Sequence, residues 1–371
     1  MFSFENNGTK EKILKKISIF LAPLDWGLGH ATRCIPLIRE LQQNNFDVII
    51  GATGKIAHLL QKEYPEILIV PFSGYGIQYS KSSRFFMFSM FLQLPKMLLS
   101  AWKENQQLKK IVIDYQIDAI ISDNRLGCFH NKLPSVFITH QLQILTGYKF
   151  LDRLVMKANY YFINQFSECW VPDTAGDLNM AGLLSHPKKM PKVPVKYIGP
   201  LSRFNFQNST IKFPLTILIS GPEPQRTIFE KLIVKQSEVF DMAVFIIRGL
   251  PESDTALTTS NKKLEYKNHL PAEALSLILQ QSEMIIARSG YSTVMDLMAL
   301  QKKAILIPTP GQTEQEYLAK KLSEEQLFFT VSQREFNLKK NVEEFISLQF
   351  RNEKFSSTLK EVIEQLKDSI N

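Results

Sequence analysis

Short apolar runs alternate with helix-like runs along most of the chain, and this alternation constrains the fold more than any other feature. The runs at 16–24, 46–53 and 283–290 are rich in Ile and Val and carry apolar residues on both faces. Strands of that kind are typical of parallel sheets, because helices cover both sides of such a sheet. The sequence therefore predicts an α/β fold built on parallel sheets.

The alternation breaks once, at 199–215, where polar residues, Gly and Pro cluster as they do in a linker. A chain of 371 residues is long enough for one domain on each side of that break. We therefore predict two Rossmann-like, doubly wound domains, an N-terminal one at 1–202 and a C-terminal one at 203–350. A last helix at 351–371 is free to pack back toward the first domain.

Charge and cysteine content narrow the class of protein. The net charge is +8 and the pI is about 9.1, but both signs are mixed along the chain, so nucleic acid is not an expected partner. The same net positive charge is compatible with binding to anionic phosphates or to an anionic membrane surface. Cys34, Cys128 and Cys169 show neither zinc nor disulfide spacing, which favours a reducing, cytoplasmic compartment. The first residues lack the apolar core of a signal peptide.

The first candidate motif is DWGLGHATR at 25–33, between the first predicted strand and its helix. Gly27 and Gly29 allow a tight turn and a close approach of a ligand to the backbone, and His30 lies where the helix starts. A tight turn with a histidine held by local hydrogen bonds would explain the motif equally well. Three flanking residues are candidates for the acceptor side of a site: Asp25, Trp26 and Arg33.

Two further strands of the first domain end in polar residues. Asp123 ends the strand before NRLG, and His140 and Gln141 end the strand at FIT. Because ligands of such sheets bind beyond the carboxyl ends of the strands, Asp123 is placed to orient a histidine, and His140 and Gln141 are acceptor-side candidates. An aspartate that caps a turn is the alternative for Asp123.

In the second half, a strand runs into the loop GPEPQRT, in which Gln225 and Arg226 open a helix. A helix N-terminus with an arginine suits a phosphate, and a proline turn at a helix entry is the alternative.

The longest candidate motif spans 287–322. Its first strand ends in Arg288, Ser289 and Gly290, the next helix opens with Ser292 and Thr293 and carries Asp296 one turn in, and a later helix opens near Gln315 and Glu316. Backbone N–H groups at such a turn suit a diphosphate, and a carboxylate one turn on can accept two ribose hydroxyls. Helix caps would explain each residue separately but not the series.

Taken together, Gly-x-Gly-His after the first strand, Ser-Gly-x-x-Thr-x-x-Asp, and a later Gln-Glu pair resemble the MurG-type glycosyltransferases, a group that includes the diacylglycerol galactosyltransferases. The resemblance covers most of the chain and implies the GT-B fold, in which two Rossmann-like domains face each other across a cleft. It implies that Asp296 binds the ribose and that the turn at 289–292 lies beside the diphosphate. It further implies that Gln315 and Glu316 contact the donor sugar and that the backbone near His269 and Leu270 reads the uracil.

The implied reaction is transfer of a hexose or N-acetylhexosamine from a UDP-sugar to a hydroxyl of a glycan or lipid-linked acceptor, with inversion. His30 would be the general base and Asp123 would stabilise its imidazolium; no metal and no cofactor beyond the UDP-sugar co-substrate are expected. Two alternatives stay open: a non-hydrolysing UDP-sugar 2-epimerase, and a non-catalytic protein that binds a sugar nucleotide or a glycan. The sequence fixes neither the sugar, the acceptor nor the oligomeric state.

The segment at 84–103 is rich in Phe, Met and Leu and is bordered by Lys and Arg. Pro95 and Lys96 interrupt it, so it falls short of the ~18 uncharged apolar residues that indicate a membrane span. Basic residues around an apolar surface favour docking on an anionic bilayer, and a buried helix pair is the alternative. We therefore expect a cytoplasmic protein of cell-envelope metabolism, peripheral on the inner face of the inner membrane if this segment docks.

Overall fold

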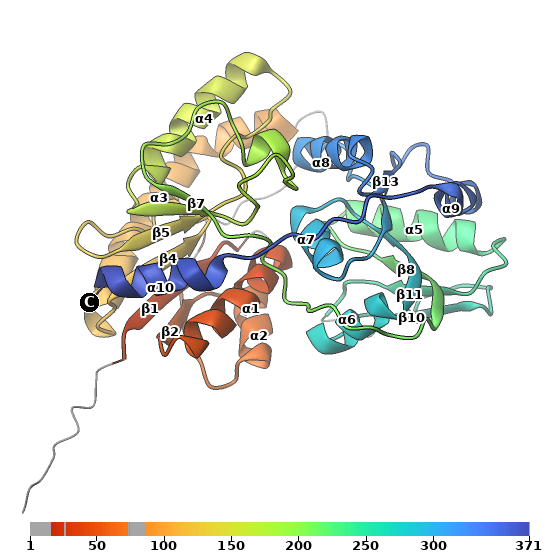
Figure 1. Ribbon diagram of the computed structural model, residues 1–371, viewed down its shortest axis with the longest axis horizontal. Helices are drawn as coiled ribbons and strands as arrows, with labels where there is room; N and C mark the ends of the chain where they lie inside the picture. The colour runs from red at the N-terminus through yellow and green to blue at the C-terminus, as the bar shows by residue number, and fades with distance from the viewer. Residues whose placement is uncertain (1–15, 26, 73, 75–85, 252, 371) are drawn as a thin grey trace, which may run out of the picture.

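The computed structural model describes residues 16–25, 27–72, 74, 86–251 and 253–370, without the side chains of 86–95 and 97. The chain forms two parallel sheets, each with helices against its faces, and the linker joins them on one side of the molecule (Figure 1). The α/β class and the two-domain GT-B arrangement predicted from the sequence are confirmed.

The first domain contains a seven-stranded sheet in which every pairing is parallel, in the order β3-β2-β1-β4-β5-β6-β7. Its strands are β1 (Ser18–Pro23), β2 (Asp47–Gly51), β3 (Leu68–Val70), β4 (Ala119–Asp123), β5 (Ser135–Ile138), β6 (Glu168–Val171) and β7 (Val195–Tyr197). Its helices are α1 (Leu28–Gln43), α2 (Gly54–Glu63), α3 (Phe86–Asp114) and α4 (Lys149–Ile163), with a short 3-10 turn, η2 (Gly182–Leu184).

Helix α1 shows how the sequence pattern sets this packing. Cys34, Leu37, Ile38 and Leu41 recur at helical spacing, and each of them is buried in the main hydrophobic core. Strand β1 is buried at all six positions, as a central strand covered on both faces should be.

The second domain contains a six-stranded parallel sheet in the order β10-β9-β8-β11-β12-β13. Its strands are β8 (Phe213–Leu218), β9 (Val244–Ile247), β10 (Leu264–Lys267), β11 (Ser282–Ala287), β12 (Ala304–Leu306) and β13 (Phe329–Thr330). Its helices are α5 (Gln225–Ser237), α6 (Ala272–Gln280), α7 (Tyr291–Ala299), α8 (Thr313–Glu324) and α9 (Leu338–Ser347).

Both sheets reverse their strand order once, between β1 and β4 in the first and between β8 and β11 in the second. In doubly wound sheets, ligands bind beyond the carboxyl ends of the strands at such a reversal, because neighbouring loops there turn to opposite faces and leave a crevice. The reversal points therefore indicate where each domain would hold its ligand.

The last helix, α10 (Leu359–Ile370), lies against the first domain rather than the second (Figure 1). Ile363 and Leu366 are buried in the same core as α1, and the ammonium of Lys367 donates to the backbone oxygen of Asn44 at 3.0 Å. The chain therefore crosses between the domains twice, once in the linker and once before α10.

Helix α3 is the longest helix, and none of the helices in the described part of the chain is both long and apolar enough to cross a membrane.

Candidate active site

His30 and Asp123 meet at the reversal point of the first sheet. His30 lies in the first turn of α1, directly after β1, and Asp123 is the last residue of β4, the strand beside β1. The ring atom Nδ1 of His30 is 2.9 Å from Oδ2 of Asp123. The sequence placed both residues at strand ends, and the strand order brings these two ends together.

The His30–Asp123 pair is buried, which shapes its protonation. Burial, followed by the positive charge of Arg33, lowers the pKa of His30 below its usual 6.5, although Asp123 acts in the opposite direction. The pKa of Asp123 is also lowered: burial opposes this, but Arg33 and His30 outweigh burial. At neutral pH the site therefore holds a neutral imidazole beside an ionised carboxylate, which is the state that a general base requires.

Three acceptor-side candidates extend this pair toward the second domain. The guanidinium of Arg33 donates to Asp123 and lies 2.8 Å from Nδ1 of His30 and 3.4 Å from Nδ1 of His140. The other ring nitrogen of His140 is 2.9 Å from Oε1 of Glu314, in the first turn of α8, and Gln141 donates to the same carboxylate. His140 and Gln141 therefore contact the other domain directly.

The N-terminal turns of α7 and α8 press against the loops of the first domain. The ring of Tyr291 stacks on that of His140, with centroids 4.1 Å apart, and its hydroxyl donates to the backbone oxygen of Pro172 at 2.7 Å. Further contacts between the domains run from Thr313 to Leu145, from Leu183 to Tyr317 and from Lys321 to Asn179. The two reversal points thus face each other across a contact that includes hydrogen bonds and the stacked rings of Tyr291 and His140.

The two glycines of the first motif have different surroundings. A Cβ atom added at Gly29 would lie 3.0 Å from Oγ of Ser292, a hydroxyl that donates to the backbone oxygen of Gly29 at 3.3 Å. Among the described residues, a Cβ at Gly27 would meet nothing within 4 Å. Gly29 therefore allows the second domain to approach, whereas no such contact of the described residues requires a glycine at 27.

On the acceptor side, Oδ1 of Asp25 is buried and has no hydrogen-bond partner among the described residues. Gly74 lies directly against this carboxylate, since an added Cβ would clash with it. Trp26, the neighbouring candidate, lies outside the described residues.

Unsatisfied polar atoms gather at the reversal point of the second sheet. Within the described residues, Oε1 of Gln225, Nε of Arg288 and Oγ1 of Thr309 are buried without a hydrogen-bond partner. Arg288 donates to the backbone oxygen of Gln225 at 3.2 Å and to that of Pro308 at 3.3 Å, which places the three residues together beyond β8, β11 and β12. Buried polar groups usually have partners, so this cluster indicates a site for a polar ligand.

Arg288 itself is 1% exposed and lies with its guanidinium 4.1 Å from the ring centroid of Phe229. Burial lowers the pKa of Arg288 to about 10. An anionic ligand nearby would favour this cation, because it would supply the negative charge that the surroundings lack.

Arg226, predicted from the sequence to bind phosphate, is instead committed to protein groups. Its guanidinium donates to Glu223 at 2.7 Å and to Glu230 at 2.9 Å, and Glu230 also accepts from Arg248 at 2.8 Å. A phosphate would have to displace these partners.

The remaining residues of the long motif tie β11 to α8. Ser289 donates to the backbone oxygen of Gln315 at 2.9 Å, and the side-chain oxygen of Gln315 accepts from the backbone of Thr309 at 2.9 Å. Gly290 caps α7, and Thr293 lies half-buried in its first turn.

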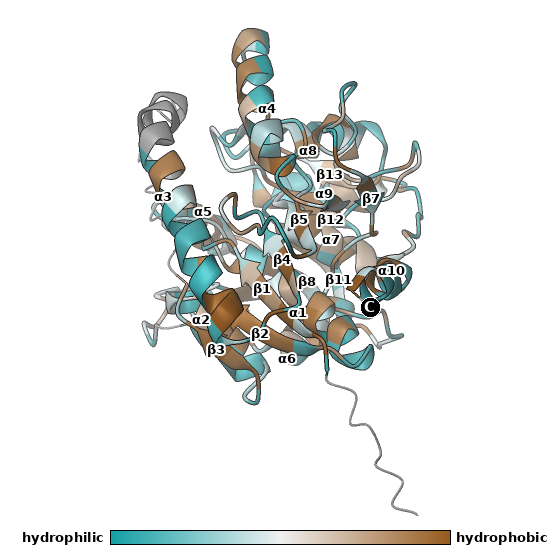
Figure 2. Cartoon of the chain, turned by 90° about the vertical axis from the view of Figure 1, so that its left-hand side faces the viewer, coloured by the Kyte–Doolittle hydropathy of each residue, from teal (hydrophilic) through white to brown (hydrophobic). Residues whose placement is uncertain are grey.

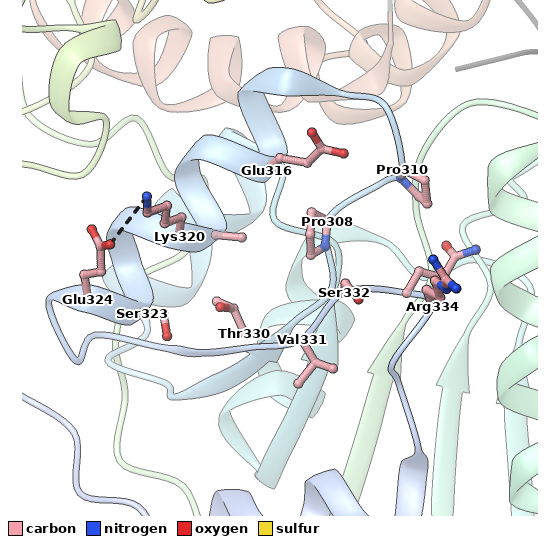
Figure 3. Close-up of a pocket in the computed structure, with 12 residues that line it drawn as sticks. Pro308, Pro310, Glu316, Lys320, Ser323, Glu324, Thr330, Val331, Ser332 and Arg334 are labelled. Carbon is pink, nitrogen blue, oxygen red and sulfur yellow. Dashed lines mark ion pairs between the residues drawn. The ribbon is translucent and has the colours of Figure 1, made fainter. Parts of the chain in front are cut away.

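Glu316 lies at the rim of a pocket of about 530 Å³ between α8, the loop before it and β13 (Figure 3). Its carboxylate accepts from the backbone of Gly311 at 2.9 Å. Pro308 and Pro310 line this pocket, and its charged lining is mixed, because Arg334 and Lys320 lie there with Glu316 and Glu324, and Lys320 pairs with Glu324 at 3.8 Å. Glu316 thus borders a cavity, whereas the side chain of Gln315 is held within the loop.

Asp296 has partners from the interdomain linker. Its carboxylate accepts from the hydroxyl of Ser202 at 2.7 Å and lies 4.0 Å from Nε of Arg203. Burial raises the pKa of Asp296 to about 6, against the opposing effects of Arg203 and Ser202. His269 and Leu270 lie in the loop between β10 and α6, and the pKa of His269 is lowered by burial and by Arg203.

Sequence reasoning missed several residues of this site. Thr309 lies three residues beyond the end of β12, where the rule applied to the other strand ends could have found it. Glu314 directly precedes Gln315 and Glu316, which the sequence singled out. Its own partner, His140, is 174 residues away, so no local pattern in the sequence marks Glu314.

Two doubly wound domains whose reversal points face each other define the GT-B class of fold. Residues 228–370 match the Glycosyltransferase family 28 C-terminal domain. An uncharacterised glycosyltransferase of Methanosarcina acetivorans is 24% identical over 339 residues, 84% of each chain. The UDP-N-acetylglucosamine–N-acetylmuramyl-(pentapeptide) pyrophosphoryl-undecaprenol N-acetylglucosamine transferase of Buchnera aphidicola is 26% identical over 223 residues, 57% of this chain and 58% of that one.

Solved structures agree on the fold. Acinetobacter baumannii MurG matches with a TM-score of 0.57 at 13% identity, covering 95% of this chain and 99% of that one. The spinosyn rhamnosyltransferase SpnG, complexed with thymidine diphosphate, matches with a TM-score of 0.61 at 15% identity, covering 95% and 96%. The chain therefore has the GT-B fold and resembles the MurG-like glycosyltransferases, with its residues 228–370 matching the C-terminal domain of glycosyltransferase family 28.

Proposed function

We propose that this glycosyltransferase moves a hexose or N-acetylhexosamine from a UDP-sugar to a hydroxyl, with inversion at the anomeric carbon. The observation that carries the proposal is the His30–Asp123 pair, buried at the reversal point of one domain and facing the start of α7 in the other. A base on one side of the cleft and a nucleotide on the other is the arrangement that direct displacement requires.

The second reversal point would hold the donor. The unsatisfied donors, Nε of Arg288 and the hydroxyl of Thr309, would bind the diphosphate, together with the N-terminus of α7. Asp296, one turn into α7, would exchange Ser202 for the ribose hydroxyls, and the backbone near His269 would bind the base. A uridine nucleotide is supported by the Buchnera relative, whose donor is UDP-N-acetylglucosamine.

Within this arrangement, His30 acts through Nε2, since both contacts that the described residues make with its ring use Nδ1. Nε2 takes the proton of the acceptor hydroxyl as the oxygen attacks the anomeric carbon, and Asp123 stabilises the imidazolium that forms. The bond to the leaving diphosphate breaks on the opposite face of the sugar. Helix dipoles and buried Arg288 stabilise the developing charge, so the mechanism needs no metal.

The proposed acceptor is lipid-borne, because the first domain exposes apolar side chains on two neighbouring helices. Leu98, Leu99 and Trp102 of α3 are 54%, 54% and 60% exposed. The helices α3 and α4 rise from the same side of this domain (Figure 2), and Ala101 and Phe162 pack in one small cluster. Of the segment 84–103 singled out in the sequence, residues 84 and 85 and the side chains of 86–95 and 97 lie outside the described part.

Helix α4 adds a surface that the sequence analysis did not recognise. Phe150, Leu154 and Tyr161 are 76%, 49% and 66% exposed, and their spacing of four and seven places them on one face. A row of exposed basic residues, Lys149, Arg153 and Lys157, runs beside that face. An apolar row next to a basic row fits an anionic bilayer, in which the helix would lie in the plane of the interface.

A thermal-shift screen against UDP, thymidine diphosphate and UDP-sugars tests the donor, because a bound ligand raises the melting temperature by mass action. We expect stabilisation by UDP and by one UDP-sugar. Stabilisation by thymidine diphosphate alone would refute the uridine assignment. Conversion of a UDP-sugar to its 2-epimer in the absence of an acceptor would show that the protein is an isomerase and not a transferase.

Co-sedimentation with liposomes tests the membrane. Binding should rise with the fraction of anionic lipid, fall with salt, and drop in the variant Phe150→Ser/Leu154→Ser. Val239→Ser is the matched control, since Val239 is 88% exposed in the second domain and should not affect binding. If the wild-type protein does not bind anionic liposomes at low salt, the acceptor is soluble and the membrane proposal is wrong.

A further inference from the structure

The interdomain linker supplies a hydrogen bond to Asp296, the carboxylate proposed to bind the ribose. The hydroxyl of Ser202 donates to Oδ1 of Asp296 at 2.7 Å. The same hydroxyl oxygen accepts from the backbone N–H of Phe204 at 3.1 Å, and its one proton is directed at the carboxylate. A hydroxyl of the chain itself therefore makes the kind of contact that a ribose hydroxyl would make.

Buried neighbours hold the linker in place on both sides of Ser202. Leu201 is 3% exposed and Phe204 is 4% exposed, and both belong to the main hydrophobic core. The backbone N–H of Leu201 faces Sδ of Met295, the neighbour of Asp296 in α7, at 3.4 Å. The packing of the linker thus keeps the Ser202 hydroxyl beside Asp296.

Asp296 can accept more hydrogen bonds than this contact supplies. An ionised carboxylate has about four lone-pair sites. Among the described residues, Ser202 supplies the one hydrogen bond to this carboxylate, because Nε of Arg203 lies 4.0 Å from Oδ2, too far for a hydrogen bond. Burial raises the pKa of Asp296 to about 6, so the ionised form at neutral pH lies in surroundings that disfavour its charge. A ligand with two hydroxyls would replace one hydrogen bond with two.

We propose that Ser202 is an intramolecular competitor for the ribose of the donor, so that the linker lowers the affinity of the site for nucleotides. This inference rests on the proposed function, in which Asp296 binds the ribose. The side chain of Asp296 is 14% exposed and Ser202 lies against it, so the Ser202 hydroxyl has to turn away before a ribose binds there. A 2′-deoxyribose, with one hydroxyl, would only replace the bond that it breaks, whereas a ribose would add a second bond.

Isothermal titration calorimetry with UDP at pH 7.5 measures this competition. Ser202→Ala removes the hydroxyl that has to be displaced and leaves Asp296 in place. A hydrogen bond to a charged group has to be broken in the wild type and is missing in the variant. We therefore expect UDP to bind Ser202→Ala about tenfold more tightly than the wild type.

Thermal unfolding separates competition from a purely structural role. Without UDP, Ser202→Ala should melt below the wild type, because Asp296 has lost a hydrogen bond. At saturating UDP the two proteins should melt at the same temperature, because neither then uses the side chain at position 202 and the tighter ligand stabilises the variant more. A hydroxyl that served the fold alone would leave the same difference in melting temperature with and without UDP.

A matched variant and a second ligand make the test specific. Ser209→Ala removes a hydroxyl from the same linker, but from a stretch in which the backbone N–H groups of Gln207 and Lys212 bond to the end of α6 and not to α7. This variant should leave UDP affinity unchanged. Inorganic pyrophosphate has no ribose, so it should bind the wild type and Ser202→Ala with equal affinity.

Four results would overturn the proposal: equal UDP affinity in the wild type and Ser202→Ala, weaker binding by Ser202→Ala, a melting difference that saturating UDP does not remove, or an equal gain for pyrophosphate. UDP that binds neither protein would refute the proposed donor and the competition together. Tighter UDP binding by Ser202→Ala in a protein that transfers no sugar would refute the proposed function and leave the competition intact. UDP binding that does not respond to Ser202→Ala would refute the competition alone.

Discussion

Replacing Asp296 by Asn should make the protein more stable and a poorer binder of its donor. Burial raises the pKa of Asp296 to about 6 from a reference value of 3.8, and its side chain is only 14% exposed. A shift of about 2 pKa units corresponds to about 3 kcal/mol. Because the folded protein favours the protonated acid, the contribution of Asp296 to stability is fully present below pH ~4 and is lost as the pH rises through about 6.

Asparagine is neutral at every pH and keeps an oxygen for the hydroxyl of Ser202. The unfolding free energy of Asp296→Asn should therefore equal that of the wild type near pH 3.5 and exceed it by about 3 kcal/mol at pH 7.5. Urea unfolding followed by far-UV circular dichroism measures this difference from the midpoints, provided that the slopes agree. Affinity for UDP should fall about 100-fold in the same variant, because two charge-assisted hydrogen bonds to the ribose weaken.

The combination of results is what tests the assignment, since functional carboxylates are often held in surroundings that destabilise their charge. A variant that is less stable than the wild type at pH 7.5 and binds UDP normally would show that Asp296 serves the linker, through Ser202 and Arg203, and not the ribose.

Further predictions concern the base and the second domain. His30→Ala should lower turnover on the order of 10²–10⁴-fold, measured with saturating donor, and leave UDP affinity within twofold; near-normal turnover would move the base elsewhere. In the wild type, the acid limb of the turnover profile should lie below pH 6.5, because burial and Arg33 lower the pKa of His30; a limb above 6.5 would contradict that cause. Arg226→Ala should lower the unfolding free energy in urea by about 3 kcal/mol, because Glu230 loses a buried partner, and should leave UDP affinity unchanged. Unchanged stability with reduced UDP affinity would show that Arg226 binds the phosphate.

The sequence was sufficient for the architecture because the pattern that specifies it is local. Short runs that place apolar residues on both faces of a strand indicate buried parallel strands. The polar, Gly- and Pro-containing segment at 199–215 indicates the linker between the two sheets. Polar residues at strand ends are also readable, so His30 and Asp123 could be singled out before the strand order placed β1 beside β4.

Contacts between the domains could not be read in this way. Glu314 meets His140, and Ser292 meets Gly29, because of the way in which the two domains face each other, and no periodicity in the sequence records that orientation. Arg226 shows the same limit within one domain. A helix start with an arginine predicts a phosphate site, but the local pattern does not show that Glu230, one turn further along α5, accepts a hydrogen bond from the same guanidinium.

The stereochemistry of donor cleavage tests the central claim most directly, and it needs no knowledge of the acceptor. The protein would be incubated with the UDP-α-sugar that stabilises it, with water as the slow acceptor, and the first anomer released would be followed by ¹H NMR before mutarotation. The account predicts that the β-anomer appears first and that His30→Ala abolishes its formation. Initial release of the α-anomer, or equal release by the His30→Ala variant, would contradict inverting transfer with His30 as the base.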